Sequence, residues 1–229
     1  MPVFRLNDDP LFPPVELSSP EGIIAVGGDL SPERLLAAYS NGIFPWYSDD
    51  QPILWWSPDP RFVLFPEQLH VSRSLRRAMN KHPFTITYDT HFEGVIKGCS
   101  LPRRDGFGTW ITQDMQEAYL RLHHLGYAHS VEAWEGEKLA GGMYGVSLGS
   151  CFFGESMFTR VSNASKIALV TLVEALMEKN FTILDCQVYT ENLDRFGAVH
   201  IPRVVFLDIL AKEIKAPTLR GNWGELLTR

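Results

Sequence analysis

Residues 164–188 have the sequence ASKIALVTLVEALMEKNFTILDCQV, which predicts a long helix followed by a buried strand. We expect the helix over about Ala164 to Lys179, because apolar residues recur along it at helical spacing. We expect the strand at 182–188, where a short apolar run follows the end of the helix. This strand carries Asp185 and Gln187 two positions apart.

The segments on either side extend this pattern. Ser130 to Trp134 and Leu139 to Val146 predict a hairpin, and Ser150 to Phe158 predicts a third strand. A short helical stretch follows residue 188, and an amphipathic helix is expected near Val204 to Ile214. Strands, helix, strand and helix in this order predict an α+β fold with one mixed sheet.

The N-terminal part of the chain is less regular and rich in Pro, Gly and Trp. We predict a smaller N-terminal α/β domain over residues 1–70 and a larger domain over 71–229, with a boundary that could extend to about residue 110. One helix is well marked by Ser31 as N-cap, Pro32 in the first turn and Gly42 beyond the end. Further along we expect helices at 72–79, 92–96 and 113–125, a strand at 84–88 and a loop at 101–109.

The composition limits the possible functions. The 229 residues are 45% hydrophobic and 21% charged, with a formal net charge of −6. A net acidic protein is a poor general binder of nucleic acid, so we expect no DNA partner, although a local basic patch remains compatible with the charge. No segment approaches the roughly 18 apolar residues of a membrane span, and the N-terminus has acids and prolines where a signal peptide needs an apolar run.

The cysteines and histidines predict neither a disulfide framework nor a metal site. The three cysteines are far apart and form no CxxC pair, so we expect reduced, buried thiols. No two histidines have ligand spacing followed by a third ligand. Together with the absence of a signal peptide, these features predict a cytoplasmic protein without a metal or a cofactor.

Three polar side chains stand out against apolar surroundings. Side chains alternate along a strand, so Asp185 and Gln187 should share one face and Cys186 the other. A carboxylate in such a strand is costly unless it is hydrogen-bonded, and an Asp satisfied by backbone N–H groups is as good an interpretation as a functional one. Glu155, which lies among Cys151, Phe152, Phe153 and Met157, favours the functional interpretation.

Other features suggest contact with nucleic acid. Trp46 and Trp110 lie in loops, where a tryptophan can stack on a nucleobase, although core packing is its more usual role. Arg73, Arg77 and Lys81 recur at i, i+4 and i+8, so one helix would present them as a basic stripe on a single face, for which a solvated face is the alternative. The basic residues are Arg73, Arg76, Arg77 and Lys81.

Several strings of this chain resemble one family. GIFPW, WWSPDPR, GTWIT, GGMYGV, GESMF and DCQV resemble the leucyl/phenylalanyl-tRNA–protein transferases, from about Glu21 to Pro202. The resemblance implies a GNAT-like acyltransferase C-terminal domain with a smaller N-terminal domain set against it. It implies transfer of leucine or phenylalanine from Leu-tRNA or Phe-tRNA to proteins with N-terminal Arg or Lys, which marks them for degradation. The aminoacyl-tRNA is then a co-substrate, and no cofactor is implied.

The resemblance also implies roles for individual residues. Asp185 and Gln187 match a catalytic pair, Glu155 matches a carboxylate of the cleft, and Trp46 and Trp110 match the pair that holds the terminal adenosine. We expect the Glu155 carboxylate to bind the Arg or Lys side chain of the acceptor, and the basic residues to contact tRNA phosphates. The aminoacyl pocket would be lined by Met143, Phe152, Leu169, Leu172 and Leu184.

The implied chemistry needs positioning more than strong acid–base catalysis. The ester is already activated, the attacking α-amine has a pKa of about 7.7–8.0, and proximity can supply roughly 7–11 kcal/mol. We expect Gln187 to accept a hydrogen bond from the amine and Asp185 to orient the Gln187 amide. An apolar pocket should admit Met as well as Leu and Phe.

Two other functions are compatible with parts of this sequence. A GNAT-type transferase that uses acyl-CoA needs a glycine-rich pyrophosphate loop, and residues 160–165 contain no glycine. A non-catalytic RNA-binding module would use the tryptophans and the basic stripe, but it gives no role to Asp185, Gln187 and Glu155.

Overall fold

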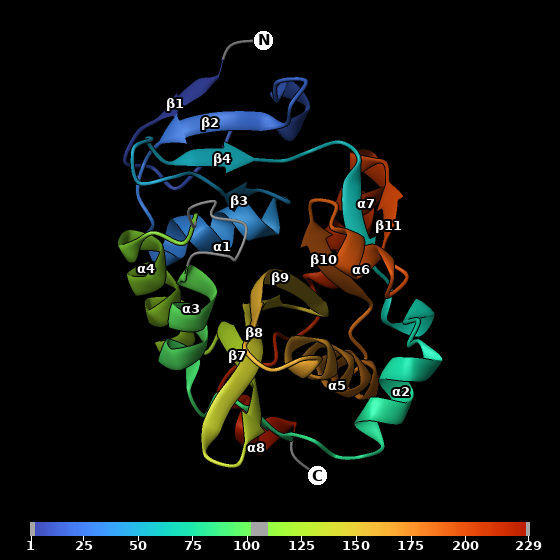
Figure 1. Cartoon of the computed structure of the whole chain (residues 1–229). Helices are drawn as coiled ribbons and strands as arrows, with labels where there is room; N and C mark the ends of the chain where they lie inside the picture. The colour runs from blue at the N-terminus through green and yellow to red at the C-terminus, as the bar shows by residue number, and fades with distance from the viewer. Residues whose placement is uncertain (1–2, 102–109, 228–229) are drawn as a thin grey trace.

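The computed structural model describes residues 3–101 and 110–227, and within them the chain forms two sheets. The smaller sheet has the strand order β1-β2-β4-β3, and helix α1 (Pro32–Ser40) lies beside it (Figure 1). Ser31 caps this helix by accepting a hydrogen bond from the Arg34 amide, as predicted. The strands are β1 (Phe4–Leu6), β2 (Ile23–Gly27), β3 (Phe44–Pro45) and β4 (Leu54–Trp56), with a 3-10 turn at Val15–Leu17.

The larger sheet has the strand order β11-β5-β10-β9-β8-β7-β6. Its central neighbours β9 and β10 are parallel and the other pairs are antiparallel. The predicted mixed α+β architecture is therefore confirmed, with a second sheet in addition to the one expected. The strands are β5 (Arg61–Leu64), β6 (Thr85–Tyr88), β7 (Ala128–Glu135), β8 (Lys138–Leu148), β9 (Cys151–Thr159), β10 (Ile183–Gln187) and β11 (Val199–Ile201).

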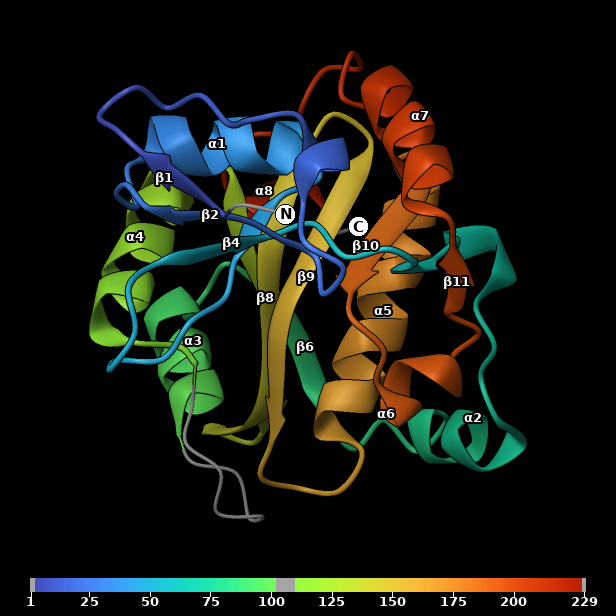
Figure 2. The same cartoon turned by 90° about the horizontal axis from the view of Figure 1, so that it is seen from above.

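Helices cover both faces of the larger sheet. Figure 2 shows α3 (Phe92–Ser100) and α4 (Gln113–His124) on one side of β8 and β9, and α5 (Ala164–Glu178) on the other. The remaining helices are α2 (Arg73–Met79), α6 (Glu191–Asp194), α7 (Arg203–Glu213), α8 (Trp223–Leu226) and a 3-10 turn at Pro66–Gln68. Within residues 3–101 and 110–227, none of the helices is long and apolar enough to cross a bilayer.

The predicted helices and strands are present within a few residues of their expected ends. Of the predicted loop at 101–109, only Leu101 lies within the described residues. The chain leaves the smaller sheet at Trp56 and enters the larger one at Arg61. A domain division after residue 70 remains a prediction.

The core consists of two buried clusters. One contains residues of α1, α3 and α4, such as Tyr39, Val95 and Tyr119, and the other is built around α5, with Leu169 and Val173. Helix α1 shares this cluster with α4 and with Phe153 of β9. The N-terminal sheet therefore packs through α1 on the larger sheet and on the helix that covers it. This packing brings side chains from both parts of the chain to the point where β9 and β10 separate.

Candidate active site

A cavity of about 660 Å³ lies where two parallel neighbours of the sheet separate. Strands β9 and β10 pair from Cys151 and Ile183 to Phe153 and Asp185. Beyond these pairs, residues 154–159 of β9 and residues 186–188 line the cavity. Because the two strands separate, the cavity reaches both faces of the sheet, and helices that cover each face contribute residues to its lining.

A β-bulge in β9 sets the direction of Glu155. Tyr144 of β8 pairs with Ser156, and the next residue, Gly145, pairs with Gly154, so Glu155 is the extra residue. A bulge interrupts the ladder and redirects a side chain. The Glu155 side chain consequently lines the cavity although its neighbours continue the strand.

A second bulge lies at the end of β10. Asp185 pairs with Val63 of β5 and Gln187 pairs with Phe62, which leaves Cys186 as the extra residue. Gln187 has φ of 64°, a left-handed conformation that a non-glycine residue rarely adopts. The expected strict alternation is therefore wrong at this point, because Cys186 and Gln187 both line the cavity.

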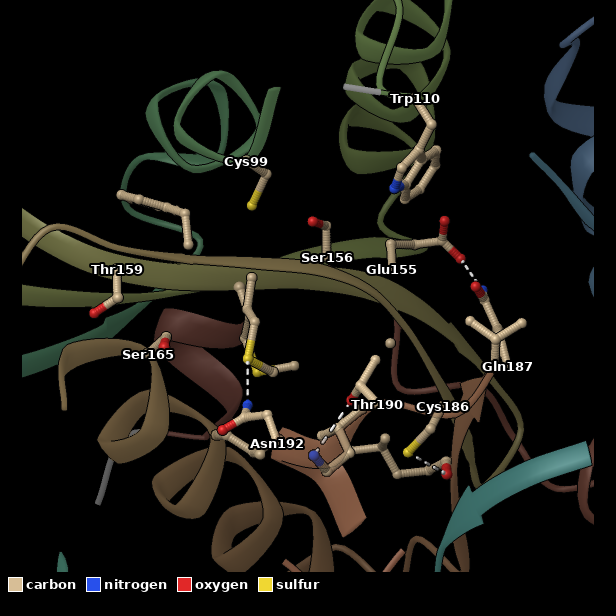
Figure 3. A pocket seen from close by; sticks show the side chains of 18 of the residues that line it. Cys99, Trp110, Glu155, Ser156, Thr159, Ser165, Cys186, Gln187, Thr190 and Asn192 are labelled. Atoms are coloured by element: carbon tan, nitrogen blue, oxygen red, sulfur yellow. Dashed lines mark hydrogen bonds between the residues drawn. The ribbon is translucent and has the colours of Figure 1, made fainter. Parts of the chain in front are cut away.

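Glu155 is held by three donors from three elements. Tyr39 of α1 donates to Oε1 over 2.7 Å, Tyr119 of α4 donates to Oε2 over 2.8 Å, and Nε2 of Gln187 donates to Oε1 over 2.6 Å. The two tyrosine oxygens also lie within hydrogen-bonding distance of each other, but each hydroxyl has a single proton, which it donates to the ionised Glu155 carboxylate. Figure 3 shows the Glu155 and Gln187 side chains meeting below Trp110. Glu155 and Gln187, which come from the paired strands β9 and β10, are thus in direct contact.

This environment changes the acidity of the site. Removal from water raises the pKa of Glu155 to about 7, and the charge of Asp185 adds to the rise. The hydrogen bonds from Tyr39, Tyr119 and Gln187 oppose part of it. Burial, followed by the charge of Glu155, raises the pKa of both tyrosines well above the ordinary value. Near pH 7 the Glu155 carboxyl therefore exists in both protonation states.

Asp185 lies behind the cavity wall and not on it. Its fully buried carboxylate binds Arg61 of β5 through two contacts, Nε to Oδ1 at 2.8 Å and Nη2 to Oδ2 at 2.7 Å. The Arg61 guanidinium lies between the rings of Phe44 and Phe206, at 4.8 and 4.7 Å from their centroids. A bidentate pair between two aromatic faces is a rigid arrangement.

The contact from Asp185 to Gln187 differs from the expected one. Oδ1 of Asp185 accepts the backbone N–H of Gln187 at 2.9 Å, while the side-chain amide of Gln187 donates to Glu155. Asp185 therefore fixes the backbone at the bulge and does not contact the side-chain amide. Sequence reasoning missed Arg61, although it ends the WWSPDPR string, because its partner lies 124 residues away.

Both predicted tryptophans line the cavity. Trp46 is 38% exposed, and its ring packs against Trp56 with a centroid distance of 5.5 Å. Nε1 of Trp56 donates to the Trp46 carbonyl oxygen over 2.7 Å, which fixes the backbone of this loop. Trp110 is partly buried and lies on the Glu155 side of β9 in Figure 3.

The apolar lining agrees with the prediction in part. Met143, Leu169 and Leu184 line the cavity, together with Met157, which the pocket prediction did not include. Phe152 and Leu172 were predicted to line it, but they are fully buried in the α5 core cluster and are not part of the lining. Apolar character alone does not tell a pocket wall from the core behind it. Asn192 donates to the Met157 sulfur over 3.4 Å, which positions this side chain.

The basic residues lie on and after α2. Arg73 and Arg77 are exposed, and Arg76 forms an ion pair with Glu174 of α5 at 3.0 Å. The helix ends at Met79, so Lys81 lies beyond it and the expected i+8 helical phase is wrong for that residue. Arg77 and Lys81 nevertheless line one shallow cavity of about 250 Å³ with Ser162 and Asn163.

Two further observations complete the site. Lys166, at the start of α5, also lines the main cavity. Over residues 3–101 and 110–227, there is no group of three or more His, Cys, Asp or Glu side chains that could hold a metal ion.

The comparison with known proteins identifies the family. The family model for leucyl/phenylalanyl-tRNA protein transferase matches residues 63–211, and the model for the N-terminal domain of that transferase matches residues 28–59. The chain belongs to this family. Leucyl/phenylalanyl-tRNA–protein transferases of Syntrophus aciditrophicus, Anaeromyxobacter sp. strain K and Myxococcus xanthus are 56%, 57% and 57% identical to it. These alignments cover 98%, 97% and 98% of this chain and 94%, 96% and 97% of the relatives.

The solved structures give weaker similarity. The C-terminal domain of a putative lysylphosphatidylglycerol synthetase from Agrobacterium fabrum is 10% identical, with a TM-score of 0.39 over 72% of this chain and 53% of that one. Membership of the leucyl/phenylalanyl-tRNA–protein transferases makes the chain an aminoacyltransferase, and this decides against acyl-CoA transfer and against an RNA-binding module without catalysis.

Proposed function

We propose that the cavity between β9 and β10 binds the aminoacyl-adenosine end of Leu-tRNA or Phe-tRNA and presents it to a protein with N-terminal Arg or Lys. The observation that carries the proposal is the contact between Glu155 and Gln187 at the wall of this cavity. The product would carry a new N-terminal residue that serves as a degradation signal in the cytoplasm. The opening between parallel neighbours supports assigning the larger domain to the GNAT-like acyltransferases.

The donor would be held at both of its ends. Trp46 and Trp110 would stack on the terminal adenine, an interaction worth about 1–3 kcal/mol per base. The Leu or Phe side chain would pack against Met143, Leu169 and Leu184, with Met accepted as well because a methylene contributes only about 1–3 kcal/mol. Charged side chains would be excluded by the cost of losing water in an apolar pocket.

The Gln187 amide would guide the attacking amine. Because its Nε2 donates to Glu155, its oxygen is the end that can accept an N–H from the acceptor. Asp185 would act through the backbone of Gln187, with Arg61 holding the carboxylate in place. Glu155 would bind the acceptor, and proximity would supply most of the acceleration.

The body of the tRNA would lie against α2. Arg73, Arg77 and Lys81 would contact phosphates, which position a nucleic acid without reading its sequence. Arg76 would contribute less, because Glu174 already pairs with it.

The direct test is to incubate the protein with Phe-tRNA and synthetic peptides and to measure the peptide mass. Peptides that begin with Arg or Lys should gain one phenylalanine residue, whereas matched peptides that begin with Ala or Glu should gain none. Equal modification of all four peptides would contradict the acceptor proposal, and failure to modify any of them would contradict the whole assignment.

A further inference from the structure

The hydrogen-bonding capacity of Glu155 is nearly used up by the protein. An ionised carboxylate offers about four lone-pair positions, two on each oxygen. Tyr39 and Gln187 occupy both positions on Oε1, and Tyr119 occupies one on Oε2. One position on Oε2 is left for a ligand.

This count distinguishes between two kinds of acceptor group. A guanidinium pairs with a carboxylate through two parallel N–H donors and needs one lone pair on each oxygen. Oε1 has no free lone pair for such a donor, so Glu155 is poorly suited to bind the side chain of an N-terminal Arg. A single ammonium donor fits the remaining position. The ammonium group that Arg-initiated and Lys-initiated acceptors have in common is the α-ammonium, which is the reacting group itself.

The neighbouring side chain brings that group to the same place. In the proposed function the Gln187 amide oxygen accepts an N–H of the acceptor's α-nitrogen, and Nε2 of the same amide lies 2.6 Å from Glu155 Oε1. A nitrogen held by this amide is therefore beside the Glu155 carboxylate. Both side chains are directed there by β-bulges, and both line the cavity.

We propose that Glu155 accepts the proton that the acceptor's α-ammonium must lose before it attacks the ester, and that Tyr39 and Tyr119 are positioning residues for this carboxylate. The proposal rests on the proposed function and assigns the acceptor contact to the α-nitrogen in place of the side chain. It leaves the cationic side chain of the acceptor to be recognised elsewhere.

Protons and bonds balance over the whole transfer. Ionised Glu155 takes one proton from the α-ammonium, and the neutral amine forms the new C–N bond at the ester carbonyl carbon. The bond from that carbon to the ribose oxygen of the tRNA then breaks, and the second proton from nitrogen goes to this oxygen. Protonated Glu155 finally releases its proton to water, so that the overall reaction yields an amide, a free ribose hydroxyl and one proton.

The electrostatic environment is consistent with this role. Burial raises the pKa of Glu155 to about 7, close to the value of about 7.7–8.0 for an α-amine, and a general base works best when its pKa lies near the working pH. The negative charge of Asp185 contributes to this rise, and the ion pair with Arg61 offsets part of that charge. The titratable groups that interact with Glu155 are Tyr39 on α1, Tyr119 on α4, Tyr144 on β8 and Asp185 on β10. The other titratable residues of the cavity lining are Cys99, Lys166 and Cys186, and Arg61 lies beyond them, paired with Asp185.

The first experiment compares wild type with Glu155→Gln from pH 6 to 9, using phenylalanyl-adenosine and an Arg-initiated peptide. In the variant, only amine that is already neutral can react. The rate of the variant should therefore rise with pH as the α-ammonium loses its proton. From a pKa of about 7 for Glu155 and about 7.7–8.0 for the amine, the ratio of wild-type to variant kcat/KM should fall about three- to fivefold between pH 7 and pH 9. If Glu155 instead paired with the guanidinium, the ratio would rise about twofold over that range, and this result would overturn the proposal.

The second experiment removes the hydroxyl groups. Tyr39→Phe and Tyr119→Phe each delete a donor that lowers the pKa of Glu155, so the acid limb of the pH–rate profile should move to higher pH. Tyr144→Phe is the matched control, since Tyr144 is buried against the Tyr119 ring and its hydroxyl has no hydrogen-bond partner within residues 3–101 and 110–227. A pH-independent loss in all three variants would overturn the positioning role. Failure of wild type to modify the Arg-initiated peptide would instead contradict the proposed function.

Discussion

At the scale of single residues, Glu155 couples activity to stability. Its pKa of about 7 in the folded protein exceeds its ordinary value of 4.5, so the folded state binds this proton more tightly than the unfolded chain does. A carboxyl of this kind contributes stability that is fully present below its unfolded pKa and is lost as the pH rises through about 7. The ionised form that would accept a proton is thus also the form that weakens the fold.

We therefore expect Glu155→Gln to flatten the pH dependence of stability. Between pH 5 and pH 8 the free energy of unfolding of wild type should fall relative to that of the variant, because only wild type has to ionise a carboxyl held away from water. Urea unfolding at several pH values measures the difference. Parallel curves for the two proteins would show that Glu155 is as well hydrated in the folded state as in the unfolded one.

The two cavity tryptophans make a separate prediction. Trp46→Ala and Trp110→Ala should each weaken binding of a non-hydrolysable aminoacyl-adenosine analogue by about 1–3 kcal/mol, the stacking free energy of one base. Isothermal titration calorimetry measures the change. Trp134→Ala, in β7 and outside the cavity lining, is the control and should bind like wild type. Wild-type affinity in both cavity variants would make these tryptophans packing residues only.

At the scale of elements, the site depends on two interrupted strands. The bulges of β9 and β10 direct Glu155 and Gln187 toward each other, and the buried pair of Arg61 and Asp185 holds the second bulge in its strained conformation. Breaking a buried ion pair by removing one partner leaves an unpaired charge and costs about 3–5 kcal/mol. Asp185 should therefore matter for the fold as well as for turnover.

This difference separates Asp185 from Gln187. Asp185→Ala should lose both stability and transfer, whereas Gln187→Ala should lose transfer with little loss of stability, as measured by urea unfolding and by initial rates. Replacing the pair together, as Arg61→Met with Asp185→Leu, should restore much of the stability. Transfer should stay low in the double variant because the backbone amide of Gln187 has no carboxylate to bind. Recovery of transfer along with stability would show that Asp185 serves the fold alone.

Element patterns account for what the sequence could and could not predict. Apolar periodicity and helix caps predicted the helices and strands well, because these signals are local. The bulges were not predicted, since each arises from the register with a partner strand, at Val63 and Phe62 for β10. Tyr39 and Tyr119 were missed for a similar reason, because α1 and α4 bring them to Glu155 from 116 and 36 residues away.

At the scale of the whole molecule, the chemistry and the expected tRNA contacts lie on different elements. The cavity is built from β9, β10 and the N-terminal part of the chain, whereas Arg73 and Arg77 lie on α2. A protein with net charge −6 needs such a localised basic surface to hold a polyanion. The two parts can therefore be tested separately with donors of different size.

Neutralising Arg73, Arg77 and Lys81 together should weaken binding of full-length Phe-tRNA and reduce its salt dependence. The slope of log K against log salt should fall by about 0.7–0.9 for each phosphate that the variant no longer neutralises, because fewer counterions are released on binding. Phenylalanyl-adenosine lacks the phosphates that α2 would touch, so its rate of transfer should hardly change. Arg76→Ala is the control, since the ion pair with Glu174 already occupies that guanidinium and its effect on the slope should be smaller. An unchanged slope in the triple variant, or an equal fall in activity with both donors, would show that Arg73, Arg77 and Lys81 form a solvated face with no part in tRNA binding.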